Sequence, residues 1–301
     1  MTLVKLSSDF DDLSLGVALV PAGTEKPRAI FQIVHGMAEH KERYYPFMEY
    51  LSQNGFVCVI HDHRGHGESV KSEQDLGYMY DGGARALVED VKKVQDWAKA
   101  QYPGLPVYLF GHSMGSMVVR AFARRYDDSI AKLIVSGCPS DNPAKGIALA
   151  LARIIGALKG ANRPSRLLNK LAFGSYGTMF EKENPLAWLS ANKQNTLDYR
   201  DDPLCGFIFT ANGFENLFKI MKACYAPKGW KMANPSLPIR FISGGDDPCR
   251  ISDKDFYKAV DFMKKRGYTN VTSILYPGLR HEILLENEPK VWEDVLEFIS
   301  E

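Results

Sequence analysis

Short apolar runs rich in branched side chains recur along the chain, and most are followed by a turn and then by a helical pattern. Runs of this length and composition predict buried strands. They cover residues 30–34, 56–60, 106–110, 131–135, 239–243 and 271–276.

Helical patterns separate the predicted strands. In residues 84–102, apolar side chains three or four positions apart share one face of a predicted helix, and Pro103 with Gly104 ends that helix. Strands that alternate with helices indicate βαβ units and a mostly parallel sheet, which is the α/β class. Residues 14–21 alternate between apolar and polar positions and predict antiparallel strands at the edge of the sheet. The other predicted helices cover residues 114–126, 253–265 and 289–299.

The alternation disappears between residues 142 and 235, where the pattern is helical or irregular and several aromatic side chains occur. We interpret this block as an insertion between two strands of the sheet. The predicted organisation is a core domain formed by residues 1–141 and 236–301, with a helical cap formed by residues 142–235.

Composition and charge narrow the class of protein. The chain has 301 residues, a formal net charge of +1, 45% hydrophobic and 24% charged side chains, which is typical of a globular protein. A dedicated nucleic-acid-binding protein would be visibly basic and is excluded. The sequence has no signal-peptide pattern, and no apolar run approaches the roughly 18 residues of a membrane-spanning helix. Five scattered cysteines without CxxC spacing predict free thiols, and hence a cytoplasmic protein.

The strongest chemical signal is Gly111-His112-Ser113-Met114-Gly115, which lies between a predicted strand and a predicted helix. This is the context of a Gly-x-Ser-x-Gly nucleophile elbow. The turn is so sharp that the positions two residues either side of the serine must be small, and glycines occupy both. The start of a helix also directs N–H groups toward a developing oxyanion. We predict that Ser113 is a nucleophile.

A serine nucleophile needs a base, and only one histidine follows Ser113. The six others lie at or before position 112, whereas His281 comes shortly after the predicted strand 271–276. Loops at the carboxyl ends of strands are where α/β sheets assemble their sites. We predict that His281 is the general base.

The third member of such a triad is an acid on the loop after the preceding strand. Asp246 and Asp247 both follow strand 239–243, and Asp141, after an earlier strand, is a more remote candidate. The chain order Ser-Asp-His is the order found in α/β-hydrolases and differs from that of other serine hydrolases.

Four segments carry a family resemblance. Residues 35–44 follow the pattern HGxxEHxxRY, residues 62–69 resemble a DxxGHGxS loop, residues 111–115 read GHSMG, and residues 244–247 form a Gly-x-x-Asp run. Together they resemble the monoglyceride lipase and lysophospholipase family of S33-type serine hydrolases in the α/β-hydrolase superfamily. The resemblance implies an α/β-hydrolase fold with a helical cap and selects Asp247 as the acid. It covers the framework and fades over residues 142–235.

The same resemblance implies an oxyanion hole, and general reasoning agrees with it. A second N–H must come from the loop after an early strand, and Gly36 and Met37 follow strand 30–34. The predicted donors are the backbone N–H groups of Met37 and Met114. Gly36, Gly111, His112 and Gly115 are predicted to support them.

Two further features allow alternative interpretations. His61, His63 and His66 resemble the first ligand set of a metallo-β-lactamase-like hydrolase, but Gly65 stands where that set needs an aspartate. We prefer a buried polar turn under the site, and we expect neither metal nor cofactor. Cys249, near the acid loop, is either a modifiable thiol or, as is commoner, a small buried residue.

The predicted cap begins with the most apolar stretch of the chain, residues 147–158. Residues 142–180 contain no acidic side chain, and an apolar helix flanked by positive charge can rest on an anionic lipid surface. The alternative is a helix packed on the core with its basic residues solvated. The basic residues are Lys145, Arg153, Lys159, Arg163, Arg166 and Lys170.

The expected activity is hydrolysis of acyl esters, such as monoacylglycerols or lysophospholipids, through an acyl-enzyme, with a small-molecule substrate as the partner. A serine aminopeptidase is an alternative, because Glu181, Glu183 or Glu215 could bind an N-terminal ammonium. Thioesterase or perhydrolase chemistry uses the same triad, and a non-catalytic ligand-binding homologue is a remote alternative. Ser113 itself excludes the dehalogenases and epoxide hydrolases that use an aspartate nucleophile.

Overall fold

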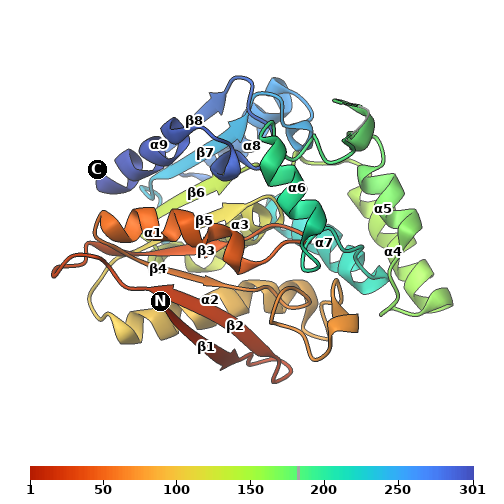
Figure 1. The fold of residues 1–301 in the computed structure, drawn as a ribbon, viewed down its shortest axis with the longest axis horizontal. Coiled ribbons are helices and arrows are strands. Elements are labelled where there is room, and N and C mark those ends of the chain that lie inside the picture. Colours follow the sequence, from red (N-terminus) through yellow and green to blue (C-terminus); the bar gives the residue numbers. More distant parts are fainter. Residues whose placement is uncertain (182–183) are drawn as a thin grey trace.

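The computed structural model describes residues 1–181 and 184–301. Within these residues, eight strands form one twisted sheet in the order β1-β2-β4-β3-β5-β6-β7-β8 (Figure 1). The strands are β1 (Thr2–Ser7), β2 (Ser14–Val20), β3 (Ala29–Val34), β4 (Phe56–His61), β5 (Val107–His112), β6 (Lys132–Ser136), β7 (Ile239–Gly244) and β8 (Val271–Tyr276).

The sheet is mostly parallel, as predicted. All the pairings among β3 to β8 are parallel. Strand β2 pairs antiparallel with both β1 and β4. The segment predicted at the edge is β2, but at this end of the sheet the edge strand is β1, which the pattern did not indicate. In β1, Val4 and Leu6 are only half-buried and Leu3 is exposed, so the strand lacks the apolar run that marks the central strands.

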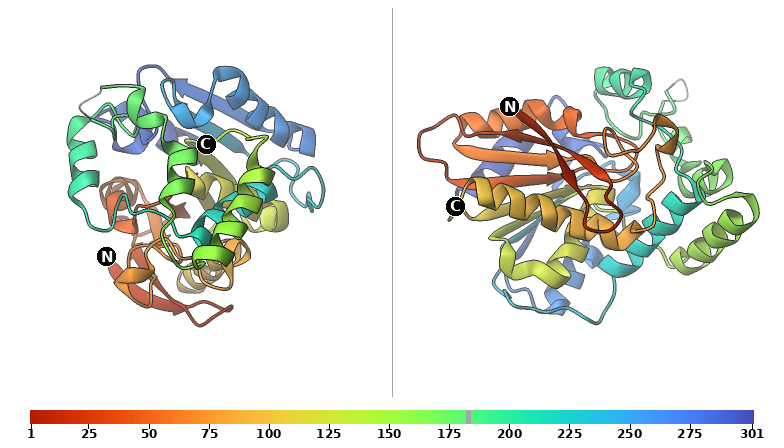
Figure 2. Two further views of the ribbon diagram at one scale, coloured as in Figure 1. Left: turned by 90° about the vertical axis from the view of Figure 1, so that its right-hand side faces the viewer. Right: turned by 90° about the horizontal axis from the view of Figure 1, so that it is seen from below.

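Helices cover both faces of the sheet. Alternate side chains of a strand point to opposite faces, so Ile30 and Val34 contribute to one apolar cluster while Phe31 and Ile33 contribute to the other. Helices α2, α3 and α8 pack on the first face, and α1 and α9 on the second (Figures 1 and 2). These helices are α1 (Tyr45–Gln53), α2 (Gly83–Gln101), α3 (Met114–Tyr126), α8 (Asp253–Arg266) and α9 (Pro289–Ser300).

The chain between β6 and β7 forms helices at the carboxyl ends of the parallel strands (Figure 1). Helix α7 packs against α4 and also against α2 and α3, so it joins the other helices of this segment to the sheet layer. The limits of the cap, 142 and 235, stay a prediction. No helix in the described residues combines the length and the apolar character needed to cross a membrane. The helices of the segment are α4 (Lys145–Lys159), α5 (Arg166–Phe173), α6 (Lys193–Asp201) and α7 (Ala211–Cys224).

Candidate active site

Ser113 occupies the turn between β5 and α3. Its backbone has φ 52° and ψ −116°, a strained conformation for a residue other than glycine. Gly111 and Gly115 must be glycines because other backbone atoms lie too close for a side chain. A Cβ at Gly111 would lie 2.5 Å from the carbonyl oxygen of Gly115, and a Cβ at Gly115 would lie 2.1 Å from the carbonyl oxygen of Val34. The two glycines therefore allow α3 to pass close to β3 and β5 and to present the serine above the sheet.

Ser113, His281 and Asp247 form a hydrogen-bonded row at the carboxyl ends of β5, β8 and β7. The Nε2 atom of His281 lies 2.8 Å from Oγ of Ser113, and Nδ1 of His281 lies 2.9 Å from Oδ2 of Asp247. These distances fit a nucleophile, a base and an acid that orients the base. The structure thus brings together the three residues predicted for the triad.

Asp247 is buried, and its carboxylate accepts hydrogen bonds from two other residues besides its contact with His281. The hydroxyl of Ser243 and the backbone N–H of Cys249 donate to its carboxylate at 3.1 and 2.8 Å. Burial by itself would raise the pKa of Asp247, but the charge and hydrogen bond of His281 outweigh burial and lower the pKa. Neither other candidate acid is part of the row: Asp246 is exposed, and Asp141 is exposed and pairs with Lys145.

His281 is also buried, and its protonation depends on Asp247. Burial opposes the positive charge, yet the carboxylate of Asp247 raises the pKa of His281 well above its usual value. The imidazolium that forms when a base accepts a proton from serine is therefore stabilised by a neighbouring negative charge.

Met37 and Met114 carry the predicted oxyanion donors, and both line the same pocket as Ser113. Nδ1 of His35 lies 2.8 Å from the carbonyl oxygen of Gly36, while Nε2 of His35 accepts the N–H of His63 at 2.9 Å. With the Gly36 carbonyl turned to the His35 ring, the trans peptide directs the N–H of Met37 to the opposite side. Neither Met N–H donates to another atom of the described residues.

Two of the three histidines that suggested a metal site, His63 and His66, hold backbone groups. Nε2 of His66 accepts the N–H of Ala38 at 3.2 Å, and Nε2 of His63 lies 3.1 Å from the carbonyl oxygen of His35. Burial lowers the pKa of His61 and of His66 to about 4, and lowers the pKa of His35 and of His63 well below its usual value. These contacts support the interpretation as a buried polar turn under the site.

His61 provides a test of acid sensitivity, because neither of its ring nitrogens has a hydrogen-bond partner among the described residues. Its pKa is about 4 in the folded chain, against about 6.5 in an unfolded one, so the unfolded state binds the extra proton as the pH falls between these values. We expect His61→Leu to flatten the loss of stability by about 1.4 kcal/mol per pH unit in that window. Urea denaturation of both proteins at pH 7.5, 6.0 and 5.0 measures this, and parallel pH curves would contradict it.

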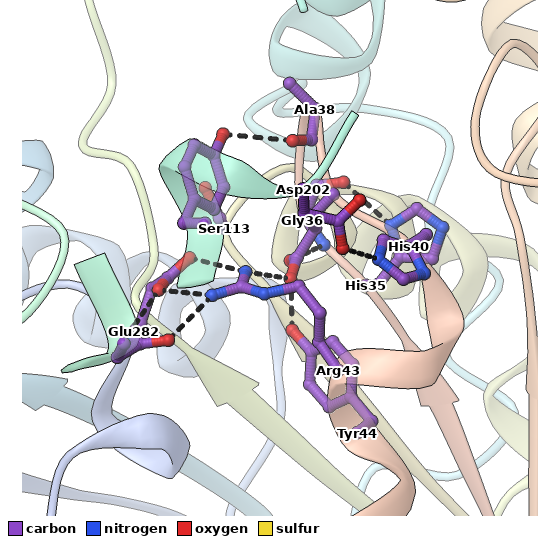
Figure 3. A network of polar contacts seen from close by, with 12 residues as sticks. His35, Gly36, Ala38, His40, Arg43, Tyr44, Ser113, Asp202 and Glu282 are labelled. Carbon is purple, nitrogen blue, oxygen red and sulfur yellow. Dashed lines mark hydrogen bonds and ion pairs between the residues drawn. The ribbon is translucent and has the colours of Figure 1, made fainter. Parts of the chain in front are cut away.

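Arg43 joins residues 35–40, the predicted oxyanion loop, to the loop that carries His281 (Figure 3). Its guanidinium contacts Glu39 at 2.7 Å and both carboxylate oxygens of Glu282 at 2.8 Å, and it donates to Asn195 of α6 at 3.0 Å. Burial raises the pKa of Glu39; in Glu282 the same effect of burial is outweighed by Arg43, which lowers the pKa. Glu39 in turn accepts the N–H of Gly36. One buried ion network therefore supports both sides of the site.

The site opens into an apolar cavity of about 590 Å³. Its floor is formed by Gly36, Met37, Ser113, Met114 and His281, and its walls come mainly from the segment between β6 and β7. A cavity of this size and character suits a small molecule with a hydrocarbon portion. Apolar wall residues include Ile147, Leu151, Leu168, Leu171, Phe173, Trp188, Phe207, Leu217 and Phe218.

The acids considered for binding an ammonium are elsewhere. Glu181 pairs with Arg280 at 3.1 Å, Glu215 pairs with Arg153 and Lys219, and neither glutamate lines the cavity. Glu183 lies outside the described residues. Of the glutamates that do line the cavity, Glu39 and Glu282, both contact Arg43 as described above.

The described residues include five buried cysteines and two groups of possible metal ligands. All five cysteines are free and buried, and burial raises the pKa of the Cys249 thiol, whose Sγ lies 3.9 Å from Nε2 of His281. Two groups in the described chain bring metal-type ligands together: Asp247 with Cys249 and His281, and His40 with Asp202 and Cys205. The first already forms the hydrogen-bonded row. In the second, His40 and Asp202 bond each other at 2.7 Å.

Comparison with known proteins places the chain in a family. The profile of the hydrolase family described as "serine aminopeptidase, S33" matches residues 25–288. The chain belongs to this family. The match spans the elbow, both segments predicted to form the oxyanion hole and the Asp247 and His281 loops, and it confirms the family resemblance inferred from the four motifs.

Two of the relatives that the chain resembles are lipases. The monoglyceride lipase of Mus musculus is 31% identical over 93% of this chain and 83% of its own length. The monoacylglycerol lipase of Mycolicibacterium smegmatis is 26% identical over 91% of this chain and 88% of its own. The crystal structure of a thermostable carboxyl esterase from Bacillus coagulans, in complex with glycerol, superposes with a TM-score of 0.89 at 25% identity over 99% of this chain and 97% of that one. The α/β-hydrolase fold is confirmed, and the protein is a serine hydrolase of the ester-hydrolase type.

Several residues around the site were not found from the sequence. Arg280 and Glu282 flank His281, Glu286 follows five positions after it, and Trp188 lies against its ring, but none of them belongs to a motif that indicates a chemical role. Trp188 lies in the block where the alternating pattern is lost, and its partner is 93 positions away. Adjacency to His281 was the only available signal for the charged residues.

Proposed function

We propose that the protein hydrolyses carboxylic esters that carry an acyl chain, such as monoacylglycerols or lysophospholipids, with Ser113, His281 and Asp247 as the triad. The observation that supports this proposal most is the apolar cavity of about 590 Å³ that opens directly onto Ser113. The names of the relatives, monoacylglycerol lipase and monoglyceride lipase, agree with it.

In the proposed reaction, Nε2 of His281 accepts the proton of Ser113 as Oγ attacks the ester carbonyl. The N–H groups of Met37 and Met114 stabilise the oxyanion, and Asp247 stabilises the imidazolium. The tetrahedral intermediate expels the alcohol, which takes its proton from His281. Water, deprotonated by His281, then cleaves the acyl-enzyme and regenerates Ser113. No cofactor is required for these steps.

Ester hydrolysis is favoured over the aminopeptidase alternative by the charges of the cavity. An N-terminal ammonium needs an unpaired carboxylate near the scissile bond, but Glu39 and Glu282 are both engaged by Arg43. Glu181 and Glu215 are paired with basic residues outside the cavity. The walls instead offer aliphatic and aromatic side chains to an acyl chain.

A substrate panel tests the ester proposal. We expect kcat/KM for p-nitrophenyl esters to rise from acetyl to medium-length acyl chains, because each buried methylene contributes about 0.8 kcal/mol, or roughly fourfold. Monoacylglycerols should be hydrolysed, and aminoacyl amides should react far more slowly. Thioesters of the same acyl chains provide a direct comparison, and Ser113→Ala provides the blank. Faster turnover of the amides would contradict the proposal.

We also propose that the cap contacts anionic lipid surfaces transiently. Ile147 and Leu171 are 76% and 66% exposed, yet both line the cavity, so apolar side chains surround its entrance. Of the six basic residues, Lys145 and Arg153 pair with Asp141 and Glu215. The other four, Lys159, Arg163, Arg166 and Lys170, are exposed on or between α4 and α5.

Vesicle binding measures this contact. We expect the protein to sediment with phosphatidylserine-containing vesicles more than with phosphatidylcholine vesicles, and to be released by salt, because charge attraction is screened beyond about 10 Å at 0.1 M. The double variant K159E/R166E should lose most of this binding. Lys99→Glu is the matched control, since Lys99 is exposed at the end of α2. Equal binding by all three proteins would contradict the proposal.

A further inference from the structure

His281 lies under a short stretch of the cap, residues 187–192, which we name the clamp segment. The indole of Trp188 faces the imidazole of His281, with ring centroids 5.4 Å apart and an interplanar angle of 36°. The Trp188 ring also lies near those of Tyr176 and Phe173, with ring centroids 5.1 and 6.4 Å away, and it is stacked on Phe173. The indole is therefore packed against the imidazole of His281 and against two aromatic side chains of the cap.

The clamp segment is fixed to the loop that carries His281 by one buried carboxylate. Glu286 accepts the backbone N–H groups of Ala191 and Asn192, both at 2.9 Å, and the hydroxyl of Ser190 at 2.8 Å. It also accepts the N–H of Arg280 at 3.1 Å, so the same carboxylate reaches the residue immediately before His281. A carboxylate with four donors in a buried site restrains all of the groups that it joins.

Other contacts reinforce the same attachment. The guanidinium of Arg280 donates to the carbonyl oxygens of Ala187 at 2.7 Å and Ser190 at 3.3 Å. The N–H of Glu282, the residue after His281, donates to the carbonyl oxygen of Leu189 at 2.8 Å. The residues before and after the catalytic ring are thus both bound to the clamp segment.

We propose that Glu286 and Trp188 act together as positioning residues of the catalytic base. The Glu286 carboxylate fixes the clamp segment on the histidine loop, and the clamp segment holds the indole of Trp188 against the imidazole of His281. The indole then limits tilting of the ring away from Ser113. It also places a π face within the roughly 6 Å at which an imidazolium is attracted to an aromatic ring. This inference rests on the proposed function, because it takes His281 as the base.

Attachment of the clamp segment to the histidine loop restricts how the cap can move. A segment that must stay on the histidine loop during catalysis cannot swing away with each substrate that enters. Helices α4 and α5 carry the exposed entrance residues and have no such attachment to the histidine loop within the described residues. We therefore expect substrate to enter on the α4–α5 side of the cap. The clamp segment stays in place with His281.

Four variants test the inference: Glu286→Gln, Trp188→Leu, Trp188→Phe and the double variant E286Q/W188L. Glu286→Gln keeps the shape of the side chain but places an NH₂ group where donors point. Because Glu286 does not line the cavity, its loss should lower kcat about tenfold and leave KM within about twofold, as expected when a base leaves its productive geometry. Trp188→Leu should lower kcat similarly, and Trp188→Phe should retain most of it.

The double variant separates positioning from general loss of structure. If both residues act through the same contact, its kcat should fall about tenfold, like that of each single variant, rather than the roughly hundredfold of independent effects. Glu288→Gln is the matched control, because Glu288 is exposed and lies two residues from Glu286. Should Glu286→Gln fail to fold, Ser190→Ala removes one of the four donors and should lower kcat about threefold.

A second measurement keeps this test separate from the proposed function. The rate at which Ser113 reacts with a fluorophosphonate depends on the base and needs no knowledge of the substrate. Slower labelling of the variants supports the inference. Wild-type labelling with unchanged rates in Glu286→Gln and Trp188→Leu, or strictly multiplicative effects in the double variant, would overturn the inference alone. No labelling of the wild type at Ser113 would overturn the proposed function instead.

Discussion

Ser113→Ala should remove ester hydrolysis and labelling by a fluorophosphonate. The hydroxyl is the only atom of this residue that can form the acyl-enzyme, and its Oγ lies 2.8 Å from Nε2 of His281. In serine hydrolases that use such a triad, loss of the nucleophile lowers kcat by roughly a millionfold. The measurement is kcat for a medium-chain p-nitrophenyl ester, together with gel detection of the labelled protein.

Ser140→Ala is the matched control for this prediction. Ser140 also lines the cavity, but its hydroxyl donates to the carbonyl oxygen of Arg250 rather than to a histidine. We expect this variant to label and to hydrolyse the ester at a rate near that of the wild type. Alanine keeps a Cβ at the strained φ of 52°, so Ser113→Ala should fold like the wild type. Hydrolysis that survives in folded Ser113→Ala would show that another nucleophile carries the reaction.

The elbow was accessible from the sequence because local chemistry determines it. A serine with Gly111 and Gly115 two positions to either side, between a strand and a helix, predicts a sharp turn, and the structure has that turn with close contacts at both glycines. His281 was selected by order along the chain. Strands β3 to β7 were accessible for a similar reason, since buried parallel strands are continuous apolar runs.

The choice between Asp246 and Asp247 as the acid could not be made from the neighbouring residues alone. Asp246 and Asp247 are adjacent and chemically identical, so the residues alone left both open, and the family resemblance selected Asp247. The structure gives the physical reason for a difference between them. Asp247 points into the protein, with Ser243 and Cys249 as donors, whereas Asp246 faces solvent.

Most of the site residues that could not be predicted from the sequence are held by contacts between distant parts of the chain. Glu286 binds residues 190–192, and Arg43 binds Glu282 at a separation of 239 positions. Such pairs have no periodic pattern, because a loop residue is placed by the elements at its two ends rather than by its own spacing. Helix α1 was missed for a different reason: it is only nine residues long and follows directly on a short 3₁₀ turn.

Asp247→Asn should lower kcat by about ten-thousandfold, the size found when the acid of a triad becomes an amide. An asparagine cannot stabilise the imidazolium, and its NH₂ group in place of Oδ2 faces Nδ1 of His281. Asp246→Asn is the matched control and should change kcat by less than about twofold, since exposed polar substitutions have small effects. A larger loss in Asp246→Asn than in Asp247→Asn would reverse the assignment of the acid.

The pH dependence of the Asp247 variant gives a second, independent readout. A base works only when it is neutral, so activity appears as the pH rises above the pKa of His281. The carboxylate of Asp247 raises that pKa against the opposing effect of burial. Removing the charge should therefore lower the pKa and move the acidic limb of kcat/KM to lower pH, even though the plateau is far lower. An acidic limb that moves to higher pH, or that stays where the wild type has it, would mean that Asp247 does not set the charge of the base.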